Sequence, residues 1–366
     1  MTAPTVATPV VGEARQAADV PGTSAARRRL LTYLLWRFLL IVPMVLILVT
    51  VVFFLMRLTG DPITAALGGQ LPPDELAARV HAAGFDRPLL EQYLEFLRHL
   101  AVLDLGTTLT DHQAVTHVFT TYGTATLELV GYALVVALAV GLPLGALAAH
   151  RRDTPTDAGL RVAAVLGYAT PLFFFGLLLK LVFSLWLGWF PVAGRASLQS
   201  QTALDTLVAP SGIFLVDALR LGDPAVVLDV LHHAVLPAVA LGLLTGGIFL
   251  RLVRTHVAGT LATDYVEAGR SRGIGELSLV SRHAAKPALV PVMTVMGMQI
   301  AGLLGGAVLT ETTFEWKGLG YVLTQYIQAR DYVAVQGIVV LLAVVVALMS
   351  FLVDVLALVV DPRVRY

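Results

Sequence analysis

The sequence contains no cysteine in 366 residues, which excludes a disulfide framework and thiolate chemistry. Charged residues are also scarce, at 14% of the chain against about 25% in soluble domains. The net charge is zero, so the chain offers no bulk electrostatic attraction to nucleic acid. We therefore expect no nucleic-acid partner.

Motifs for catalysis and cofactor binding are missing as well. No glycine-rich phosphate loop is followed by a lysine, so the chain has no visible means of binding ATP. His112, His232 and His233 have no Glu or His at metal-ligand spacing, and we expect no metal site. No nucleophile and base are paired within an apolar segment. The sequence therefore predicts neither an enzyme nor a chain with a bound cofactor.

Long apolar runs are what the sequence does contain. Hydrophobic residues make up 57% of the chain and the mean hydropathy is +0.79, as in membrane proteins. A helix of roughly 20 apolar residues crosses the hydrocarbon layer, and the runs do not alternate as barrel strands do. The sequence thus predicts an all-α integral membrane protein with six transmembrane helices, at 39–58, 124–150, 160–189, 234–253, 289–310 and 335–360.

Basic residues predict the orientation, because they gather in cytoplasmic loops. With both termini in the cytoplasm, the cytoplasmic loops hold Arg151, Arg152, Arg161, Arg251, Arg254, Arg270, Arg272, Arg282 and Lys286. Residues 1–29 lack an apolar run and are predicted to be a disordered cytoplasmic tail. Residues 30–366 then form a multi-pass domain in a bacterial cell membrane. Its segments 60–120 and 195–231 are extracytoplasmic and its segment 259–287 is cytoplasmic.

The extracytoplasmic segments carry further patterns. Residues 72–75 and 88–100 each open with proline and acidic residues, which predicts two short amphipathic helices. Segment 195–231 shows less pattern. Aromatic residues between the last two spans are typical of a membrane-interface belt, with substrate contact as the alternative. They are Phe314, Trp316, Tyr321 and Tyr326.

Ionisable residues inside the apolar spans are functional candidates. Glu128 and Lys180 lie at similar depth from the outer end of their spans. We hypothesise that they face each other, or a shared aqueous cavity, and line a translocation pathway. The alternative is that Lys180 extends to the interface and Glu128 caps a helix near it.

A charged, helix-compatible stretch interrupts the apolar runs at residues 263–291. Thr263 or Asp264 suits a helix N-cap, and Glu267, three or four residues on, can complete a capping box. Tyr265, Ala268 and Ile274 offer apolar contacts. Gly269 and Gly273 permit close approach and a change of direction. Such a helix fits a docking element on the cytoplasmic face, and an ordinary interfacial helix is the alternative.

Several motifs resemble one family of transport proteins. EAGRSRG at 267–273 resembles the EAA loop of ABC importer permeases, with Gly269 in place of the second alanine. FDRPLLEQYLEFL at 85–97, GLPLGALAA at 141–149, ETTFEWKGLG at 311–320 and DPRVR at 361–365 resemble further motifs of the dipeptide, oligopeptide and nickel importers. The order is kept over about residues 30–366. The chain thus resembles the first permease subunit of these importers, with a type I ABC importer permease fold.

The resemblance implies a function and a set of partners. A second, paralogous permease would form the other half of the pathway, and an extracytoplasmic solute-binding protein would deliver peptides to it. Two cytoplasmic ATPase subunits would bind ATP and Mg, and each would receive one coupling helix. The coupling residues would be Asp264, Tyr265, Glu267, Ala268, Gly269, Arg270, Gly273 and Ile274.

Two other classes of protein fit this sequence less well. An ion-driven secondary transporter would act without ATPase subunits and would carry more ionisable groups near the middle of the membrane. An intramembrane enzyme would need paired catalytic residues within spans. The sequence does not name the substrate or the second permease.

Overall fold

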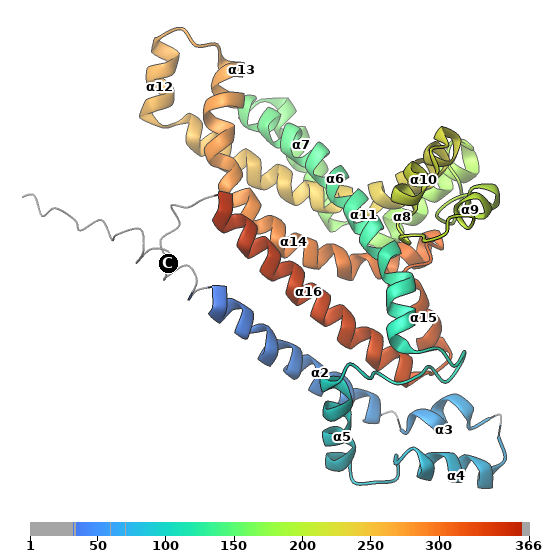
Figure 1. Cartoon of the computed structure of the whole chain (residues 1–366). Helices are drawn as coiled ribbons and strands as arrows, with labels where there is room; N and C mark the ends of the chain where they lie inside the picture. Colours follow the sequence, from blue (N-terminus) through green and yellow to red (C-terminus); the bar gives the residue numbers. More distant parts are fainter. Residues whose placement is uncertain (1–31, 33, 59, 70, 361–366) are drawn as a thin grey trace, which may run out of the picture.

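The computed structural model describes residues 32, 34–58, 60–69 and 71–360, and they are predominantly helical (Figure 1). Within these ranges the backbone forms no strand beyond an isolated bridge between Thr107 and Ala114. The all-α fold class is confirmed. The predicted tail at 1–29 lies outside the described residues.

Five long helices form the body of the part of the chain that the structure describes. Each has a stretch long and apolar enough to cross a membrane, and a bent pair of helices makes a sixth if it counts as one span. The five are α2 (Ile41–Leu58), α6 (Val115–His150), α11 (Pro224–Leu261), α14 (Ala285–Phe314) and α16 (Tyr332–Val360). All five were predicted from the sequence, although several of the predicted spans are shorter than the observed helices.

Small residues bring α6 and α11 into close contact along much of their length. A Cβ atom on Gly141 would lie 2.7 Å from the Gly246 carbonyl oxygen, and one on Gly145 would lie 2.7 Å from the Leu250 carbonyl oxygen. No larger residue fits at either position without a shift of backbone. Without a hydrophobic driving force between helices in lipid, such close backbone packing is a main source of association.

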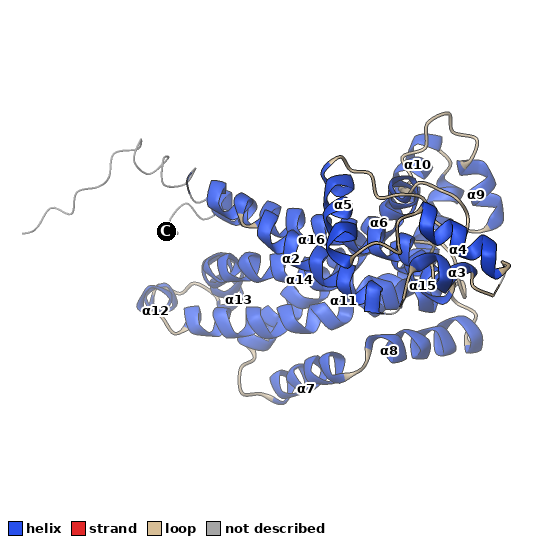
Figure 2. Cartoon of the chain, turned by 90° about the horizontal axis from the view of Figure 1, so that it is seen from below, coloured by secondary structure: helices blue, strands red, loops and turns tan. Residues whose placement is uncertain are grey.

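The third predicted span, 160–189, is not one straight helix. Helix α7 (Pro155–Ala169) and helix α8 (Leu172–Leu179), which runs on into the π-helix η1 (Lys180–Trp186), meet at 106°. Thr170 between them is extended, with ψ 127°, because a residue before proline disfavours the helical region and Pro171 follows. In Figure 2, α7 and α8 run along one edge of the molecule.

The shorter helices gather at the two ends of the long ones. At one end lie α12 (Asp264–Ser271), α13 (Glu276–Ser278) and the π-helix η2 (Leu279–Ala284). At the opposite end lie α3 (Pro62–Leu67), α4 (Pro73–Ala82), α5 (Leu89–Ala101), α9 (Leu198–Leu204), α10 (Phe214–Leu221) and α15 (Leu319–Gln328) (Figure 1). Segments 60–120 and 195–231 therefore share one end, and segment 259–287 lies at the other.

The helices predicted from the proline and acidic patterns are present as α4 and α5. Helix α5 packs on α2 through aromatic side chains, with the Phe53 and Phe96 ring centroids 5.5 Å apart. The hydroxyl groups of Tyr93 and Thr50 are 2.6 Å apart. Helices α9 and α10 were not predicted, although the Ser197 side chain accepts a hydrogen bond at the start of α9 and marks its N-terminus.

Candidate functional sites

The segment predicted to dock a partner forms a short helix, α12, that projects at one end of the molecule (Figure 1). Most of its candidate residues are exposed, and Gly269 and Ile274 are half-buried. Val266, which the sequence analysis did not single out, is fully buried. The helix packs on η2, and the Tyr265 hydroxyl donates to the His283 carbonyl at 3.3 Å. One face is thus anchored while the opposite face, which carries Glu267, is exposed.

Gly273 ends α12 as the glycine pattern predicts. Its φ of +81° is left-handed, its N–H donates to the Arg270 carbonyl at 3.0 Å, and the Ile274 N–H donates to the Gly269 carbonyl at 3.2 Å. This pair of bonds is a Schellman motif. A Cβ on Gly269 would lie 3.0 Å from Leu279 Cδ2, so glycine in place of the family's alanine lets Leu279 pack against the helix.

The predicted capping box is absent. Thr263 is the N-cap of α12, but its side chain accepts no capping bond, and its hydroxyl donates to the Thr260 carbonyl at 2.6 Å. Glu267 instead accepts from Arg270 at 3.3 Å, and Arg270 also donates to Glu276 at 2.5 Å. The hydrogen bond from Arg270 lowers the pKa of the Glu276 carboxyl group. Arg270 therefore links α12 to α13.

Glu128 and Lys180 do not pair, so the hypothesis of direct contact is wrong. The Lys180 ammonium donates to the Thr313 carbonyl at 3.0 Å, while the Glu128 carboxylate accepts from Arg195 Nη2 at 2.5 Å. Packing of α8 against α14 brings the Thr313 carbonyl within reach of Lys180. Whether the two residues line a pathway stays a prediction.

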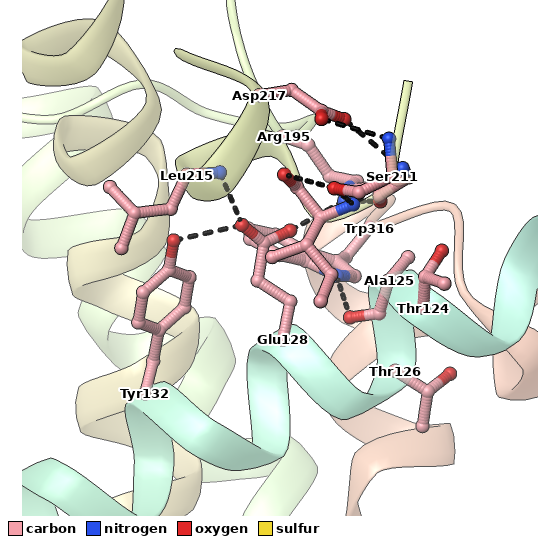
Figure 3. Close-up of polar contacts among 12 residues, drawn as sticks. Thr124, Ala125, Thr126, Glu128, Tyr132, Arg195, Ser211, Leu215, Asp217 and Trp316 are labelled. Carbon is pink, nitrogen blue, oxygen red and sulfur yellow. Dashed lines mark hydrogen bonds and ion pairs between the residues drawn. The ribbon is translucent and has the colours of Figure 1, made fainter. Parts of the chain in front are cut away.

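The partners of Glu128 form a buried polar cluster, the Glu128 cluster (Figure 3). It joins α6 to α10, which lies at the end of the molecule opposite α12 (Figure 1). The carboxylate also accepts from the Tyr132 hydroxyl and from the Leu215 N–H, both at 2.9 Å. Arg195 donates further to the Gly212 carbonyl at 2.8 Å, and its guanidinium lies 3.7 Å from the Phe214 ring centroid. The cluster therefore ties α6 to segment 195–231.

The Glu128 cluster is deeply buried. The side chains of Arg195 and Glu128 are 9% and 2% exposed. Asp217 fixes the adjoining turn, because its carboxylate accepts from the N–H groups of Ser211 at 2.8 Å and Gly212 at 3.0 Å (Figure 3). Removing one partner of such a buried pair is costly in free energy, because the other charge is left buried and uncompensated.

A second buried carboxylate, Glu311, stands at the end of α14. It accepts from the Thr126 hydroxyl at 2.7 Å and from the N–H groups of Gly320 at 2.7 Å and Tyr321 at 3.0 Å. It is fully buried and was missed in the sequence, although it opens the ETTFEWKGLG motif. Glu311 therefore joins α6, α14 and the start of α15.

The aromatic residues between the last two spans do not form an interface belt. Trp316 is fully buried, with its Nε1–H donating to the Ala125 carbonyl at 2.9 Å. Phe314 and Tyr326 are buried as well, and Tyr321 is half-buried. Trp316 packs against α6, and Phe314 packs between α11 and α8. These rings lie inside the protein, so the interface prediction is wrong.

Near the end that carries α12, Asp157 and Arg254 form a further buried pair that the sequence analysis missed. Arg254 Nε and Nη2 donate to the two carboxylate oxygens at 2.5 and 2.6 Å. The Asp157 side chain is fully buried. This two-point contact fixes the first turn of α7 against α11.

Comparisons with known proteins agree with this architecture. Residues 141–366 match the family described as binding-protein-dependent transport system inner membrane component, and residues 30–120 match the family's N-terminal region. The di/tripeptide transport system permease protein DppB of Pseudomonas aeruginosa is 38% identical over 92% of this chain and 99% of its own length. The dipeptide transport system permease protein DppB of Escherichia coli is 34% identical, and the glutathione transport system permease protein GsiC of Salmonella choleraesuis is 30% identical, with the same coverage of this chain.

Proposed function

The chain belongs to the family of binding-protein-dependent transport system inner membrane components, and on that premise we propose that it imports di- and oligopeptides. It is a multi-pass membrane permease of an ATP-driven importer and has a type I ABC importer permease fold. It is a transport subunit and not an enzyme, because ATP hydrolysis in such importers takes place in separate ATPase subunits. Family membership decides against an ion-driven transporter that acts alone. The names of its relatives support peptides as the cargo.

A permease of this kind works with ATPase subunits, a substrate-binding protein and a second permease. In this importer the second permease is a paralogue, and two ATPase subunits, which bind ATP and Mg, each receive one coupling helix. This chain supplies half of the translocation pathway and lies in a bacterial cell membrane.

Helix α12 is the coupling helix in this proposal, and its geometry is the observation that carries it. The helix is anchored on one side by the buried Val266 and stopped by the left-handed Gly273. Its outer side presents the Glu267 and Arg270 side chains, which are 72% and 41% exposed. A rigid helix with an exposed charged face transmits a push from a partner to η2 and α14, which continue from it.

The proposed orientation in the membrane places the end that carries α12 in the cytoplasm. Segment 259–287 and both termini face the cytoplasm, and segments 60–120 and 195–231 face outward, toward the substrate-binding protein. The positive-inside rule supports this assignment, because Arg151, Arg152, Arg270 and Arg272 lie in the short segments assigned to the cytoplasm.

Glu128 and Lys180 belong to the translocation pathway in this proposal, but through separate contacts. Ionisable groups inside apolar spans are rare and mark such pathways. Glu128 acts through Arg195, which holds segment 195–231 in place, and Lys180 acts through the end of α14. A movement of segment 195–231 relative to α6 would then require the contacts of the Glu128 cluster to break or to move together.

The coupling role is tested with Glu267→Lys and Gly273→Asp in the complete importer, reconstituted with its ATPase subunits and binding protein. We expect peptide uptake per ATP hydrolysed to fall at least about tenfold, the loss that about 1.4 kcal/mol of binding produces. Insertion into the membrane should not change. Glu315→Lys is the matched control, since it makes the same charge change at an exposed position outside α12 and outside segments 60–120 and 195–231. Full ATP-dependent uptake by the two loop variants would show that α12 does not couple.

The cargo is tested separately with a panel of labelled di-, tri- and oligopeptides and glutathione in the same vesicles. Competition against one labelled dipeptide ranks the substrates. If no peptide on the panel is taken up while ATP hydrolysis responds to the binding protein, the coupling role stands and the peptide assignment fails.

A further inference from the structure

A cavity of about 260 Å³ lies where the end of α2 meets α5 and the start of α16. Its lining includes Arg57, Phe96, Leu105 and Gln336. A water molecule takes up about 30 Å³ of liquid, so the cavity has room for a group larger than one or two waters. It is separate from the Glu128 cluster and from α12.

Two buried donors in this cavity have no partner. Across the ranges that the structure describes, Arg57 Nη1 and Gln336 Nε2 are buried side-chain atoms without a hydrogen bond. Both residues line the cavity, and Gln336 is only 6% exposed. Buried polar groups in folded proteins are nearly always bonded, so each orphan donor calls for an acceptor from outside the chain.

The acidic side chains of the cavity are already occupied. Asp104 accepts from the Gly106 N–H at 3.0 Å and pairs with His99 at 2.9 Å. Glu95 pairs with Arg87 at 3.3 Å. None of these contacts reaches Arg57. Among the residues that the structure describes, the one acid whose charge acts on Arg57 is Asp61 at the start of α3, which does not line the cavity, so the edge of the guanidinium that faces the cavity has no carboxylate partner among the lining residues.

Arg57 itself is held in place by other contacts. Its Nε donates to the Gln92 side-chain oxygen at 2.9 Å, and its guanidinium lies 4.8 Å from the ring centroids of both Phe53 and Phe85. Only the remaining edge of the guanidinium lacks a partner. A rigidly held cation with a free edge is suited to an anion, because no further ordering of the side chain is needed on binding.

We propose that this cavity binds the anionic group of an amphipathic molecule, a phosphate or a carboxylate attached to an apolar chain. Its oxygens accept from Arg57 Nη1 and Gln336 Nε2, and its apolar part packs on Phe96, Leu105 and Val333. The site lies at the end of α2, a helix that is long and apolar enough to span a membrane. Lipid headgroups lie near the ends of such a span. A free amphiphilic carboxylate offers the same chemistry. The proposal depends on neither the cargo nor the coupling role.

The test is a titration of the purified complete importer, followed by native mass spectrometry that gives the fraction bound. The anionic probes are dihexanoylphosphatidylglycerol and octanoate, and their neutral counterparts are dihexanoylglycerol and octanol. Gln336→Leu is the main variant, because the Nε2 atom that it removes has no hydrogen bond to lose. Arg57→Gln is the second. Arg98→Gln and Gln328→Leu make the same changes at exposed positions outside the cavity.

We expect one anionic probe to bind per permease, and no comparable binding of its neutral counterpart. Each cavity variant should bind the anionic probe at least about tenfold more weakly, because it loses a hydrogen bond to a charged group. The two exposed variants should bind as the unchanged chain does. Binding of phosphatidylglycerol alone identifies a lipid headgroup site, and binding of octanoate alone identifies a site for free amphiphilic carboxylates. Equal binding of neutral probes, or unchanged binding in Gln336→Leu, would overturn the proposal.

Discussion

Removal of Arg195 from the Glu128 cluster should be among the most damaging single changes at the end of the molecule opposite α12. Arg195→Met keeps the length of the side chain and deletes its charge. The Glu128 carboxylate then stays buried, with its side chain 2% exposed, and keeps only the Tyr132 and Leu215 donors. The Gly212 carbonyl loses its donor as well.

The magnitude follows from this geometry. Breaking a buried ion pair by removing one partner costs about 3–5 kcal/mol, because the other charge is left uncompensated. Two donors still serve Glu128, so we expect the lower end of that range, about 3 kcal/mol. Glu128→Gln in the same background removes the orphaned charge. The double variant should therefore be more stable than the sum of the two single changes predicts, by about 2 kcal/mol.

The assay is denaturant unfolding of the permease in detergent, followed by tryptophan fluorescence, since Trp316 lies 5.5 Å from the Arg195 guanidinium. Arg79→Met is the matched control. Its pair with Glu75 has side chains about half exposed, and such pairs contribute at most about 1 kcal/mol. Arg195→Lys should not restore the wild-type value, because one ammonium cannot replace a guanidinium that bonds twice and stacks on Phe214.

Two results would refute the reasoning. One is a loss in Arg195→Met no larger than in the exposed control. The other is strict additivity of the Arg195 and Glu128 changes, since two groups in direct contact inside the protein must show a coupling free energy.

Three further changes test other contacts. Gly141→Ala should destabilise the permease by about 1–3 kcal/mol in the same unfolding assay, because the new Cβ would lie 2.7 Å from the Gly246 carbonyl oxygen. Gly131→Ala is the control: in the described part of the chain no atom of a neighbouring helix lies within 4 Å of its Cβ position, so this change should be neutral or slightly stabilising. Asp331→Asn should cost about 1–3 kcal/mol, since this carboxylate accepts from the N–H groups of Leu109 at 2.6 Å and Thr110 at 2.9 Å; unchanged hydrogen exchange at those amides would contradict this. The hydrogen bond from Arg270 lowers the pKa of Glu276, so this bond is present above the ordinary carboxyl pKa and is lost as the pH falls through the lowered value. We expect amide hydrogen exchange in α12 to become faster over that pH range. Glu276→Gln should abolish the pH effect.

The sequence predicted much of the fold because the relevant signals are local. Span length depends on a run of neighbouring apolar residues, and five of the spans lie where these runs are. The stop of α12 at Gly273 depends on residues within one turn, and the pattern there was sufficient. Pro171 could have indicated the break between α7 and α8, because proline disfavours the helical conformation of the residue before it. The apolar residues on both sides of Pro171 led instead to the prediction of one continuous span.

The tertiary structure alone decided which polar groups meet. Glu128 and Arg195 are 67 positions apart, and Lys180 and Thr313 are 133 apart. No periodicity or capping rule reaches that far, because such rules act between residues in the same or adjacent turns. The partner of a buried charge is set by which helices pack and how deeply, and that depends on the burial of the whole chain. The sequence by itself therefore determined that the protein spans a membrane and where α12 lies, while packing determined the Glu128 cluster, the burial of Trp316 and the cavity at Arg57.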